Sequence, residues 1–418
     1  MSVDVKKKIE EANAEFLQRV VSGDPVLVDV VPAGDAYADF PARTILHAGP
    51  PVDWQRMSGA QRGACIGAAI FEGWAKDADE AISLLASGDI GLDPNHHHGL
   101  VGPMAGTITP SMWLWVVENK AFGNKACCRQ VEGRQQFGEY TEDALEGLVK
   151  WRDVHAPALQ TAVRSMGGLP LKPIITKALQ MGDELHNRPV AASSLLANAL
   201  SIPLLQSGLP EWQIAATYGL LGGHELLFLG LSMAAGKSIM DSARNIEYCT
   251  GVTAMARNGT EFGIQVSGLE GEWFTAPAPE VTGLFLPGFK LGDEGRDIGD
   301  SAITETVGWG GFVLGGAPGI LSFVGGTPDE ALNYSRQMRQ ITIGQSPDYL
   351  IPALGFEGTA TGIDIRKVMK TGIPPIIDTA MAHRNPGHPI IGAGLVRPPL
   401  ECFEKALKRF AEVHGIGQ

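Results

Sequence analysis

The chain has few cysteines and lacks the short motifs of several enzyme classes. Its 418 residues include five cysteines, an odd number, and no Cys-x-x-Cys pair. We therefore expect neither a disulfide framework nor a zinc ribbon. The sequence also has no Gly-x-Ser-x-Gly, no His-Glu-x-x-His and no Gly-x-x-x-x-Gly-Lys phosphate loop. These absences exclude common serine-hydrolase, zinc-protease and nucleotide-binding motifs, and unpaired thiols favour a cytoplasmic protein.

The chain also has fewer basic than acidic residues, 33 against 46. The net charge is −13 and the isoelectric point is about 5.3. Such a surface repels nucleic acid and anionic membranes, so we expect neither as a partner. The first residues, MSVDVKKKIEEANAEF, are charged and amphipathic, unlike a signal peptide. The most apolar window, Tyr218–Gly236, contains His224 and Glu225 and predicts a buried helix rather than a membrane span.

The order of apolar patterns predicts a mixed α+β / α/β protein with several domains. Over residues 1–139, helical patterns at residues 2–22 and from Gln61 to about Leu85 alternate with strand-like runs such as PVLVDVVPA. We expect these residues to form an N-terminal α/β domain. Helical periodicity dominates residues 140–248, a predicted α-helical domain. Strands return over residues 249–418 together with a helix expected near residues 328–341, which predicts a second α/β domain. The sequence therefore predicts two α/β domains with a central α-helical domain.

Polar side chains are densest within MGDELHNRPVAASS, residues 181–194. A continuous helix would place Asp183 and His186 on one face. Pro189 instead favours a helix that starts near Asn187, with Asn187 as the N-cap. Both residues would then lie on the loop entering a helix N-terminus, where anions bind. The alternative is a capped helix with an exposed Glu184–Arg188 pair. The candidate catalytic residues here are Asp183 and His186, and the candidate substrate-binding residue is Arg188.

Histidines mark two further candidate binding segments. Adjacent residues of a strand alternate faces, so the run in NHHHGLVGPMAG can direct at most two side chains to one site. The run has no known zinc spacing, and we expect no metal there. HAGPP places another histidine at the end of a strand, where ligands of α/β sheets gather. All of these could equally be structural or solvated. The candidate substrate-binding residues are His47, His96 and His97.

A hydroxyl- and glycine-rich stretch offers further polar groups. GDSAITET, residues 299–306, precedes GWGGFVLGGAPG, residues 308–319. Backbone N–H groups of such a loop can hold a phosphate or a carboxylate, although close packing of small residues explains the glycines equally well. We take Glu305 as a candidate catalytic group. The candidate substrate-binding residues are Asp300, Ser301, Thr304, Gly310 and Gly311.

The pair Asn258-Gly259 predicts a tight hairpin turn. Arg257, directly before it, could clamp a carboxylate through two parallel hydrogen bonds, or it could be a solvated turn residue. Arg257 and Asn258 complete the candidate substrate-binding residues.

Many segments together resemble one family over essentially the full length. The chain resembles the YlbE/AllG-like proteins, which are linked to the oxamate carbamoyltransferase of anaerobic allantoin breakdown. The segments that carry the resemblance are HAGPP, RGACIGAAIFEGWAKD, the histidines before GPMAG, MGDELHNR, RNGTEFGIQVSGL, WFTAP, GDSAITET, GIDIRKV and GAGLVRPPLECFEKAL.

This resemblance implies a reaction and partners. The enzyme interconverts oxamate plus carbamoyl phosphate with oxalurate plus phosphate. A chain of this family is expected to work with an FdrA-like subunit, related to acyl-CoA synthetases, and with a third small subunit. We also expect self-association into a homo-oligomer, a small anionic amide as substrate, and no cofactor, with no divalent ion indicated. The Ser-x-Arg-Thr phosphate motif of other carbamoyltransferases is absent, so carbamoyl phosphate binds either the partner chain or a new kind of phosphate site.

The polar residues can be assigned to this chemistry. Arg188 or Arg257 would bind the carboxylate of oxamate. His186 would be the base, with Asp183 as its orienting group. Backbone amides of GPMAG or of residues 308–319 would stabilise an oxyanion. Two alternatives stay open, a non-catalytic scaffold for the FdrA-like partner and an amide-processing enzyme with another small substrate.

Overall fold

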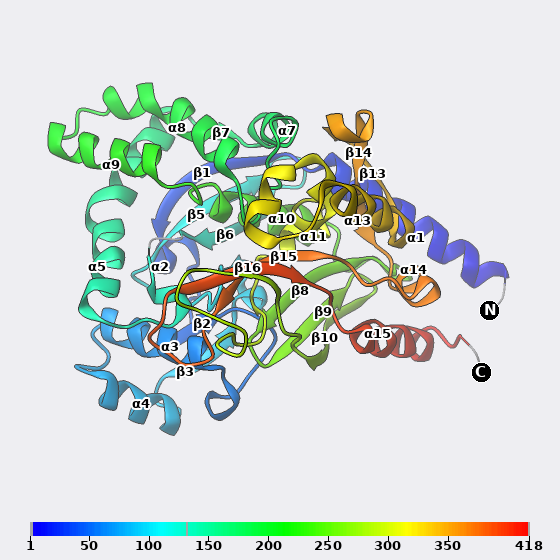
Figure 1. The fold of residues 1–418 in the computed structure, drawn as a ribbon, viewed down its shortest axis with the longest axis horizontal. Coiled ribbons are helices and arrows are strands. Elements are labelled where there is room, and N and C mark those ends of the chain that lie inside the picture. Colours follow the sequence, from blue (N-terminus) through cyan, green and yellow to red (C-terminus); the bar gives the residue numbers. More distant parts are fainter. Residues whose placement is uncertain (1–2, 131–132, 417–418) are drawn as a thin grey trace.

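The computed structural model describes residues 3–130 and 133–416, and it shows the expected mixed α/β fold (Figure 1). Among the described residues the largest sheet has five strands in the order β4-β6-β5-β1-β7. Its neighbours pair antiparallel, except for the parallel pair β4 and β6. The strands are β1 (Pro25–Pro32), β4 (Leu100–Val101), β5 (Trp113–Asn119), β6 (Lys125–Arg129) and β7 (Leu169–Pro170).

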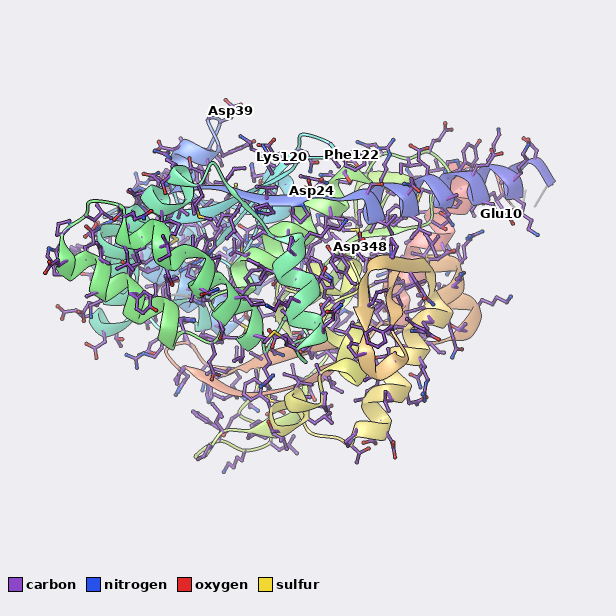
Figure 2. The ribbon with its side chains drawn as sticks, turned by 90° about the horizontal axis from the view of Figure 1, so that it is seen from above. Glu10, Asp24, Asp39, Lys120, Phe122 and Asp348 are labelled. Carbon is purple, nitrogen blue, oxygen red and sulfur yellow. The ribbon has the colours of Figure 1, made fainter. Side chains whose placement is uncertain are left out.

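Two helices from distant parts of the chain pack beside this sheet. Helix α10 (Leu229–Ser242) lies against β5 and β6 and is buried from Leu229 to Met240. Helix α1 (Val3–Ser22) packs against α10 and extends outward to the N-terminus (Figure 1). Figure 2 shows the turn with Lys120 and Phe122 close to Asp24, where Lys120 N donates to Asp24 O at 2.9 Å. The apolar window Tyr218–Gly236, predicted to be one buried helix, instead spans the end of helix α9 (Glu211–Gly223), where Tyr218 is half exposed, and the first part of the buried helix α10.

A smaller unit with the parallel strands β2 and β3 lies below the first sheet in Figure 1. One long helix was expected from residue 61 to about residue 85, but the structure has two. Helix α3 ends at Phe71, and Gly73 adopts φ +70° between the helices. The elements of this unit are β2 (Thr44–His47), η1 (Trp54–Arg56), α3 (Gly59–Phe71), α4 (Ala78–Ser87), β3 (Gly91–Pro94), η2 (Asn95–His98) and η3 (Gln135–Phe137), whereas the short helix α2 (Ala33–Ala36) contacts β1 and β5 of the first sheet.

The central segment is helical, as its periodicity predicts. Apart from the two residues of β7, the described part of residues 140–248 contains only helices and their connections. Helices α8 and α9 form an antiparallel pair at one edge of the molecule (Figure 1). The helices are α5 (Glu142–Lys150), the π-helix η4 (Trp151–His155), α6 (Ala156–Ser165), α7 (Lys172–Gln180), α8 (Val190–Leu205), α9 (Glu211–Gly223) and α10.

The C-terminal segment contributes three small antiparallel sheets. Their orders are β10-β9-β8-β12, β11-β16-β15 and β13-β14. Asn258 and Gly259 close the β8–β9 hairpin at the predicted turn. The strands are β8 (Val252–Asn258), β9 (Glu261–Val266), β10 (Leu269–Pro277), β11 (Thr282–Phe285), β12 (Ile298–Gly299), β13 (Thr342–Ile351), β14 (Glu357–Ile363), β15 (Ile377–Ala382) and β16 (Ile390–Val396). The helices are α11 (Ile303–Thr306), η5 (Gly310–Gly316), η6 (Pro318–Ile320), α12 (Leu321–Val324), α13 (Pro328–Ile341), η7 (Pro352–Leu354), α14 (Ile365–Thr371) and α15 (Leu400–Val413).

One apolar core joins the three segments that the sequence suggests as domains. The largest core cluster contains Phe16, Leu196 and Trp309, one from each segment. Each of these three side chains is buried. The structure therefore packs the segments tightly, and side chains from all three can meet at one site. Among the described residues, no helix is long and apolar enough to cross a membrane.

Candidate functional site

A cavity of about 300 Å³ lies where the three segments meet. This volume is at the lower end of the roughly 300–1,000 Å³ range of small-molecule sites. Most of its walls are apolar, with a few polar groups from separate loops. The lining residues are Pro103, Met104, Gln136, Phe137, His186, Asn187, Arg188, Val190, Glu225, Leu226, Leu229, Ser301, Ser322, Phe323, Thr379, Ala380 and Ile390.

The loop before α8 carries His186 and Arg188 into this cavity. Pro189 ends the loop and α8 begins at Val190, three residues later than the predicted start, so Asn187 is not the N-cap. Asp183 satisfies the free end of the helix instead, because its Oδ2 accepts from Ala192 N at 2.7 Å. As predicted, the loop enters a helix N-terminus.

A second carboxylate holds the same loop from within. Glu184 Oε2 accepts from His186 N at 2.8 Å, and Glu184 Oε1 accepts from Arg188 N. Ser232 Oγ of α10 donates to Leu185 O at 2.7 Å. Glu184 is buried, so the exposed Glu184–Arg188 pair does not form. The loop is rigid because its backbone polar groups are bonded on both sides.

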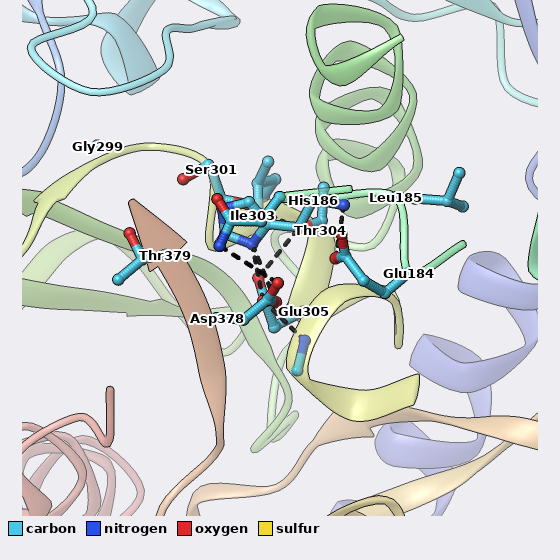
Figure 3. A network of polar contacts seen from close by, with 12 residues as sticks. Glu184, Leu185, His186, Gly299, Ser301, Ile303, Thr304, Glu305, Asp378 and Thr379 are labelled. Atoms are coloured by element: carbon cyan, nitrogen blue, oxygen red, sulfur yellow. Dashed lines mark hydrogen bonds and ion pairs between the residues drawn. The ribbon is translucent and has the colours of Figure 1, made fainter. Parts of the chain in front are cut away.

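His186 and Glu305 make the central contact of the site (Figure 3). Imidazole Nδ1 lies 2.8 Å from Glu305 Oε1 and 3.6 Å from Asp378 Oδ1. Burial alone would lower the pKa of His186, but the two carboxylates outweigh it and raise that pKa above 6.5. Burial would raise the pKa of Glu305, but His186 holds it below the ordinary 4.5. The pair therefore favours a protonated imidazole beside an ionised carboxylate.

Sequence reasoning assigned the orienting role to Asp183. The carboxylate that contacts the imidazole is Glu305, while Asp183 binds the end of α8. Thr304 Oγ1 donates to Glu305 Oε2 at 3.0 Å, and Gly311 N donates to Glu305 Oε1 at 3.0 Å. Both contacts fix the carboxylate in front of His186.

Two more buried carboxyl groups adjoin this pair. Burial raises the pKa of Asp378 to about 6. Burial, with the neighbouring Asp378, raises the pKa of Glu184 well above its ordinary 4.5. Asn187 Nδ2 donates to Asp378 Oδ2 at 3.3 Å, whereas Asp378 Oδ1 has no hydrogen-bond partner among the described residues. Asp378, with its pKa near 6, can therefore hold and release a proton beside the His186–Glu305 pair.

Three of these side chains are also close enough together to be considered as metal ligands. Single donor atoms of His186, Glu305 and Asp378 lie within 4.8 Å of one another, a spacing that could hold a small divalent cation. A cation between them would replace the proton that Nδ1 and Glu305 now share. The sequence indicates no metal, and this expectation stays a prediction.

Two glycines allow Glu305 to reach its position. Gly310 adopts φ +58°, and a Cβ there would lie 2.1 Å from Glu305 Oε1. A Cβ on Gly311 would lie 2.2 Å from the backbone oxygen of Ile376. Gly310 N donates to Glu184 O at 2.7 Å, so the N–H groups of both glycines are bonded within the protein. Their observed role is close packing around Glu305.

Arg257 lies behind the cavity wall and is fully buried rather than solvated. Its guanidinium forms a bidentate pair with Asp297, at 2.7 and 3.1 Å. It also donates to Gly299 O at 2.8 Å, Ser301 Oγ at 3.3 Å and Thr379 Oγ1 at 2.9 Å. All five N–H groups of the guanidinium have protein acceptors. Arg257 thus fixes two residues that line the cavity, Ser301 and Thr379.

Asp300 joins three loops on the far side of Ser301. Its Oδ1 accepts from Gly49 N at 2.8 Å, and its Oδ2 accepts from Asn95 Nδ2 and Gly102 N, both at 2.9 Å. Burial outweighs these bonds and raises the pKa of Asp300 to about 6. Asp300 thereby places the turn whose next residue, Pro103, lines the cavity.

The predicted histidines and Asn258 lie outside the described cavity lining, and of these His96 lies near Asp300, with Nε2 3.5 Å from Oδ1. Burial lowers the pKa of His47 to about 4 and that of His96 well below 6.5, so both are neutral. His97 is partly exposed and accepts from Trp273 Nε1 at 3.2 Å. Asn258 closes its hairpin by accepting from Thr260 N at 2.9 Å. The three-histidine run forms the short helix η2, not a strand.

Comparison with known proteins identifies the family. The family model "Oxamate carbamoyltransferase subunit AllG" matches residues 90–301. The chain is 42% identical over 415 residues to the oxamate carbamoyltransferase subunit AllG of Escherichia coli K12, covering 98% of this chain and 99% of that protein. The chain belongs to the AllG family.

Two further relatives have no assigned function. The uncharacterized protein YahG of Escherichia coli K12 is 45% identical over 412 residues, covering 98% of this chain and 87% of YahG. A crystal structure of a conserved protein of unknown function from Enterococcus faecalis V583 matches with a TM-score of 0.95 and 42% identity, covering 98% of this chain and 99% of that chain. The architecture is therefore shared with a solved structure.

Sequence reasoning found part of this site in the AllG-family chain. His186, Arg188 and Ser301 line the cavity, and Glu305 contacts His186. It missed Asp378 and Gln136. Asp378 is a lone acidic residue in the apolar strand β15, which is a usable signal for a buried polar site. Gln136 lies in a short turn without any such pattern.

Proposed function

We propose that the chain is a catalytic subunit of an oxamate carbamoyltransferase-like enzyme that interconverts oxamate plus carbamoyl phosphate with oxalurate plus phosphate. The observation that carries this proposal is the buried His186–Glu305 pair at the wall of a cavity of suitable size. Membership of the AllG family supports the reaction class. We place this activity in the nitrogen metabolism of allantoin and in the cytoplasm.

His186 would move the proton of the reaction. Its Nδ1 is engaged by Glu305, which leaves Nε2 for the substrate. In the forward direction the oxamate nitrogen attacks the carbamoyl carbon, the carbon–nitrogen bond forms, and the bond to the phosphate oxygen breaks. The nitrogen loses a proton to Nε2 of the neutral form of His186, in which Nδ1 keeps its hydrogen and donates it to Glu305. In reverse, protonated His186 returns that proton to the leaving oxamate nitrogen, a direction that its raised pKa favours.

Arg188 is the anion-binding group that we propose for the substrate carboxylate. Its side chain is 39% exposed, and its nearest carboxylate in the described chain is Asp183 Oδ1 at 3.8 Å. A Cβ on Gly319 would lie 3.1 Å from Arg188 Cζ, so the glycine-rich loop leaves room for the guanidinium. Most of its donors are thus available for a carboxylate.

The phosphate needs further positive charge. Among the described residues that line the cavity, Arg188 is the single arginine or lysine, and it is assigned to the carboxylate. We therefore propose that an FdrA-like subunit supplies the phosphate contacts and that a third small subunit completes the assembly, in which this chain also self-associates. Exposed apolar side chains on α8 and α9 support a place in an assembly. These are Ile202, Leu205, Trp212 and Tyr218.

We propose no metal or organic cofactor, because the proton-sharing pair occupies the place that a cation would need. Dialysis against a chelator should leave carbamoyl transfer unchanged. Loss of activity that returns with a divalent ion would overturn this part of the proposal.

The test is reconstitution. Phosphate release and oxalurate formation would be measured with the chain alone, with its FdrA-like and small partners, and with His186→Ala in the full mixture. His414→Ala is the control, because His414 stacks on Tyr248 at the C-terminal end of the fold. Activity that needs this chain and collapses only with His186→Ala supports a catalytic subunit. Full activity of His186→Ala would favour a scaffold role, and an inactive but assembled mixture would favour another small amide.

A further inference from the structure

Gln136 carries the largest unsatisfied hydrogen-bonding capacity on the cavity wall. Its side chain is fully buried, and neither Nε2 nor Oε1 has a hydrogen-bond partner among the described residues. Burying an amide without partners is unfavourable, so such groups are rare in native proteins. An unsatisfied amide at a cavity wall is explained by a ligand that completes its hydrogen bonds.

The neighbouring residue, Gln135, has its side-chain amide fully hydrogen-bonded within the protein. Gln135 Nε2 donates to Ala64 O at 2.6 Å and to Thr107 Oγ1 at 3.1 Å. Arg129 Nη1 donates to Gln135 Oε1 at 3.0 Å. Gln135 is therefore structural, and it leaves Gln136 as the free amide of the pair.

The backbone holds Gln136 firmly in place. Its carbonyl oxygen accepts from Ala105 N at 3.0 Å, which ties the turn to the loop that lines the cavity through Met104. Gly138 adopts φ +93°, and a Cβ there would lie 2.6 Å from Ala60 of helix α3. A group fixed in this way loses little conformational freedom when a ligand binds.

We propose that Gln136 is the specificity residue that recognises the amide or ureido group of the substrate. This inference rests on the proposed function of the cavity. A primary carboxamide offers a donor and an acceptor side by side, which complements another amide. Nε2 would donate to the carbonyl oxygen of the substrate and Oε1 would accept from its N–H. Arg188 would bind the carboxylate at the other end.

This arrangement selects against dicarboxylates. Oxalate has the shape of oxamate but carries a second carboxylate in place of the amide. Its oxygens cannot donate to Gln136 Oε1, so that acceptor would remain unpaired on binding. The loss of one or two hydrogen bonds corresponds to roughly 10- to 100-fold weaker binding of oxalate.

The experiment compares oxamate and oxalate by titration calorimetry, using the full-length chain alone and the chain assembled with its partners. The variants are Gln136→Met, which keeps the length but removes the amide, and the control Gln160→Met. Gln160 donates to Val30 O at 2.8 Å and lies outside the described cavity lining. We expect the wild type and the control to prefer oxamate by at least 10-fold and Gln136→Met to lose that preference.

A second readout separates ligand recognition from a structural role. Removing an unsatisfied buried amide should raise the melting temperature of the ligand-free chain, whereas removing a structural amide lowers it. A lower melting temperature of Gln136→Met, or an unchanged preference for oxamate, would overturn the inference and leave the proposed function standing. A wild-type assembly that binds neither ligand would overturn the substrate site and this inference with it.

Discussion

Replacing Arg257 by methionine should destabilise the whole protein. The substitution removes a guanidinium whose donors all bind protein acceptors, and it leaves the Asp297 carboxylate buried, with Thr379 Oγ1 at 3.2 Å as a remaining donor. Breaking a buried ion pair in this way costs about 3–5 kcal/mol. The equilibrium constant for unfolding should therefore rise roughly 100- to 5,000-fold. Equilibrium unfolding in urea at pH 7 measures this change.

Two controls make the Arg257 prediction specific. Arg164 forms a bidentate pair with Asp29 at 2.9 and 2.8 Å, but on the surface, so Arg164→Met should cost no more than about 1 kcal/mol. Adding Asp297→Leu to Arg257→Met should recover part of the loss, because no buried charge then remains. If Arg257→Met were as stable as the wild type but bound substrate more weakly, the structural role of Arg257 would be refuted. Arg257 would then be a substrate-binding residue, as the sequence suggested.

The remaining predictions concern the proton network and its supports. Glu305→Gln removes the main group that raises the pKa of His186, so the His186 limb of the pH–rate profile should move to lower pH, with a rate loss of roughly 10²–10⁴-fold; an unmoved limb would exclude the pairing. Gly310→Ala should reduce activity as strongly, since its Cβ would meet Glu305, whereas Gly73→Ala, at a similar φ in open space, should leave activity unchanged; equal rates for both variants would contradict this. The pKa of Asp300 is about 6 in the folded state and 3.8 without the fold, so its contribution to stability falls as the pH rises from about 4 to about 6. In urea unfolding, the free energy of unfolding of Asp300→Asn, relative to that of the wild type, should therefore rise by roughly 3 kcal/mol between about pH 4 and about pH 6. A difference between the two proteins that does not change with pH would count against the raised pKa.

Local patterns predicted the elements well. The strand expected at PVLVDVVPA follows from a short apolar run, and the helices expected at residues 2–22 and near residues 328–341 follow from period-3.6 spacing; the structure confirms these elements. The helix expected to run from residue 61 is the exception. It breaks after Phe71 because the chain turns through Gly73, and apolar spacing on both sides concealed this turn.

Contacts between distant residues could not be predicted from one sequence. His186 and Glu305 were both candidate catalytic residues, but 119 positions separate them and no local pattern shows that they touch. Asp183 was the nearer carboxylate along the chain, yet the end of α8 competes for it more effectively because its N–H groups are unpaired. The partner of His186 was therefore decided by tertiary packing.

Burial of polar side chains was equally hidden. Arg257 beside an Asn-Gly turn has the features of a solvated residue, and its burial depends on Asp297, which arrives 40 positions later to neutralise it. The sequence could not single out Gln136, because what distinguishes it is that the fold buries its amide without a hydrogen-bond partner among the described residues.

The central claim is that His186 transfers a proton within this subunit. The direct measurement is carbamoyl transfer by the reconstituted assembly with His186→Ala, with and without added imidazole. We predict a loss of roughly 10²–10⁴-fold and partial recovery with imidazole, because a small base can enter the vacated position beside Glu305. Wild-type rates for His186→Ala, or a loss that imidazole cannot restore in a correctly assembled complex, would contradict the account.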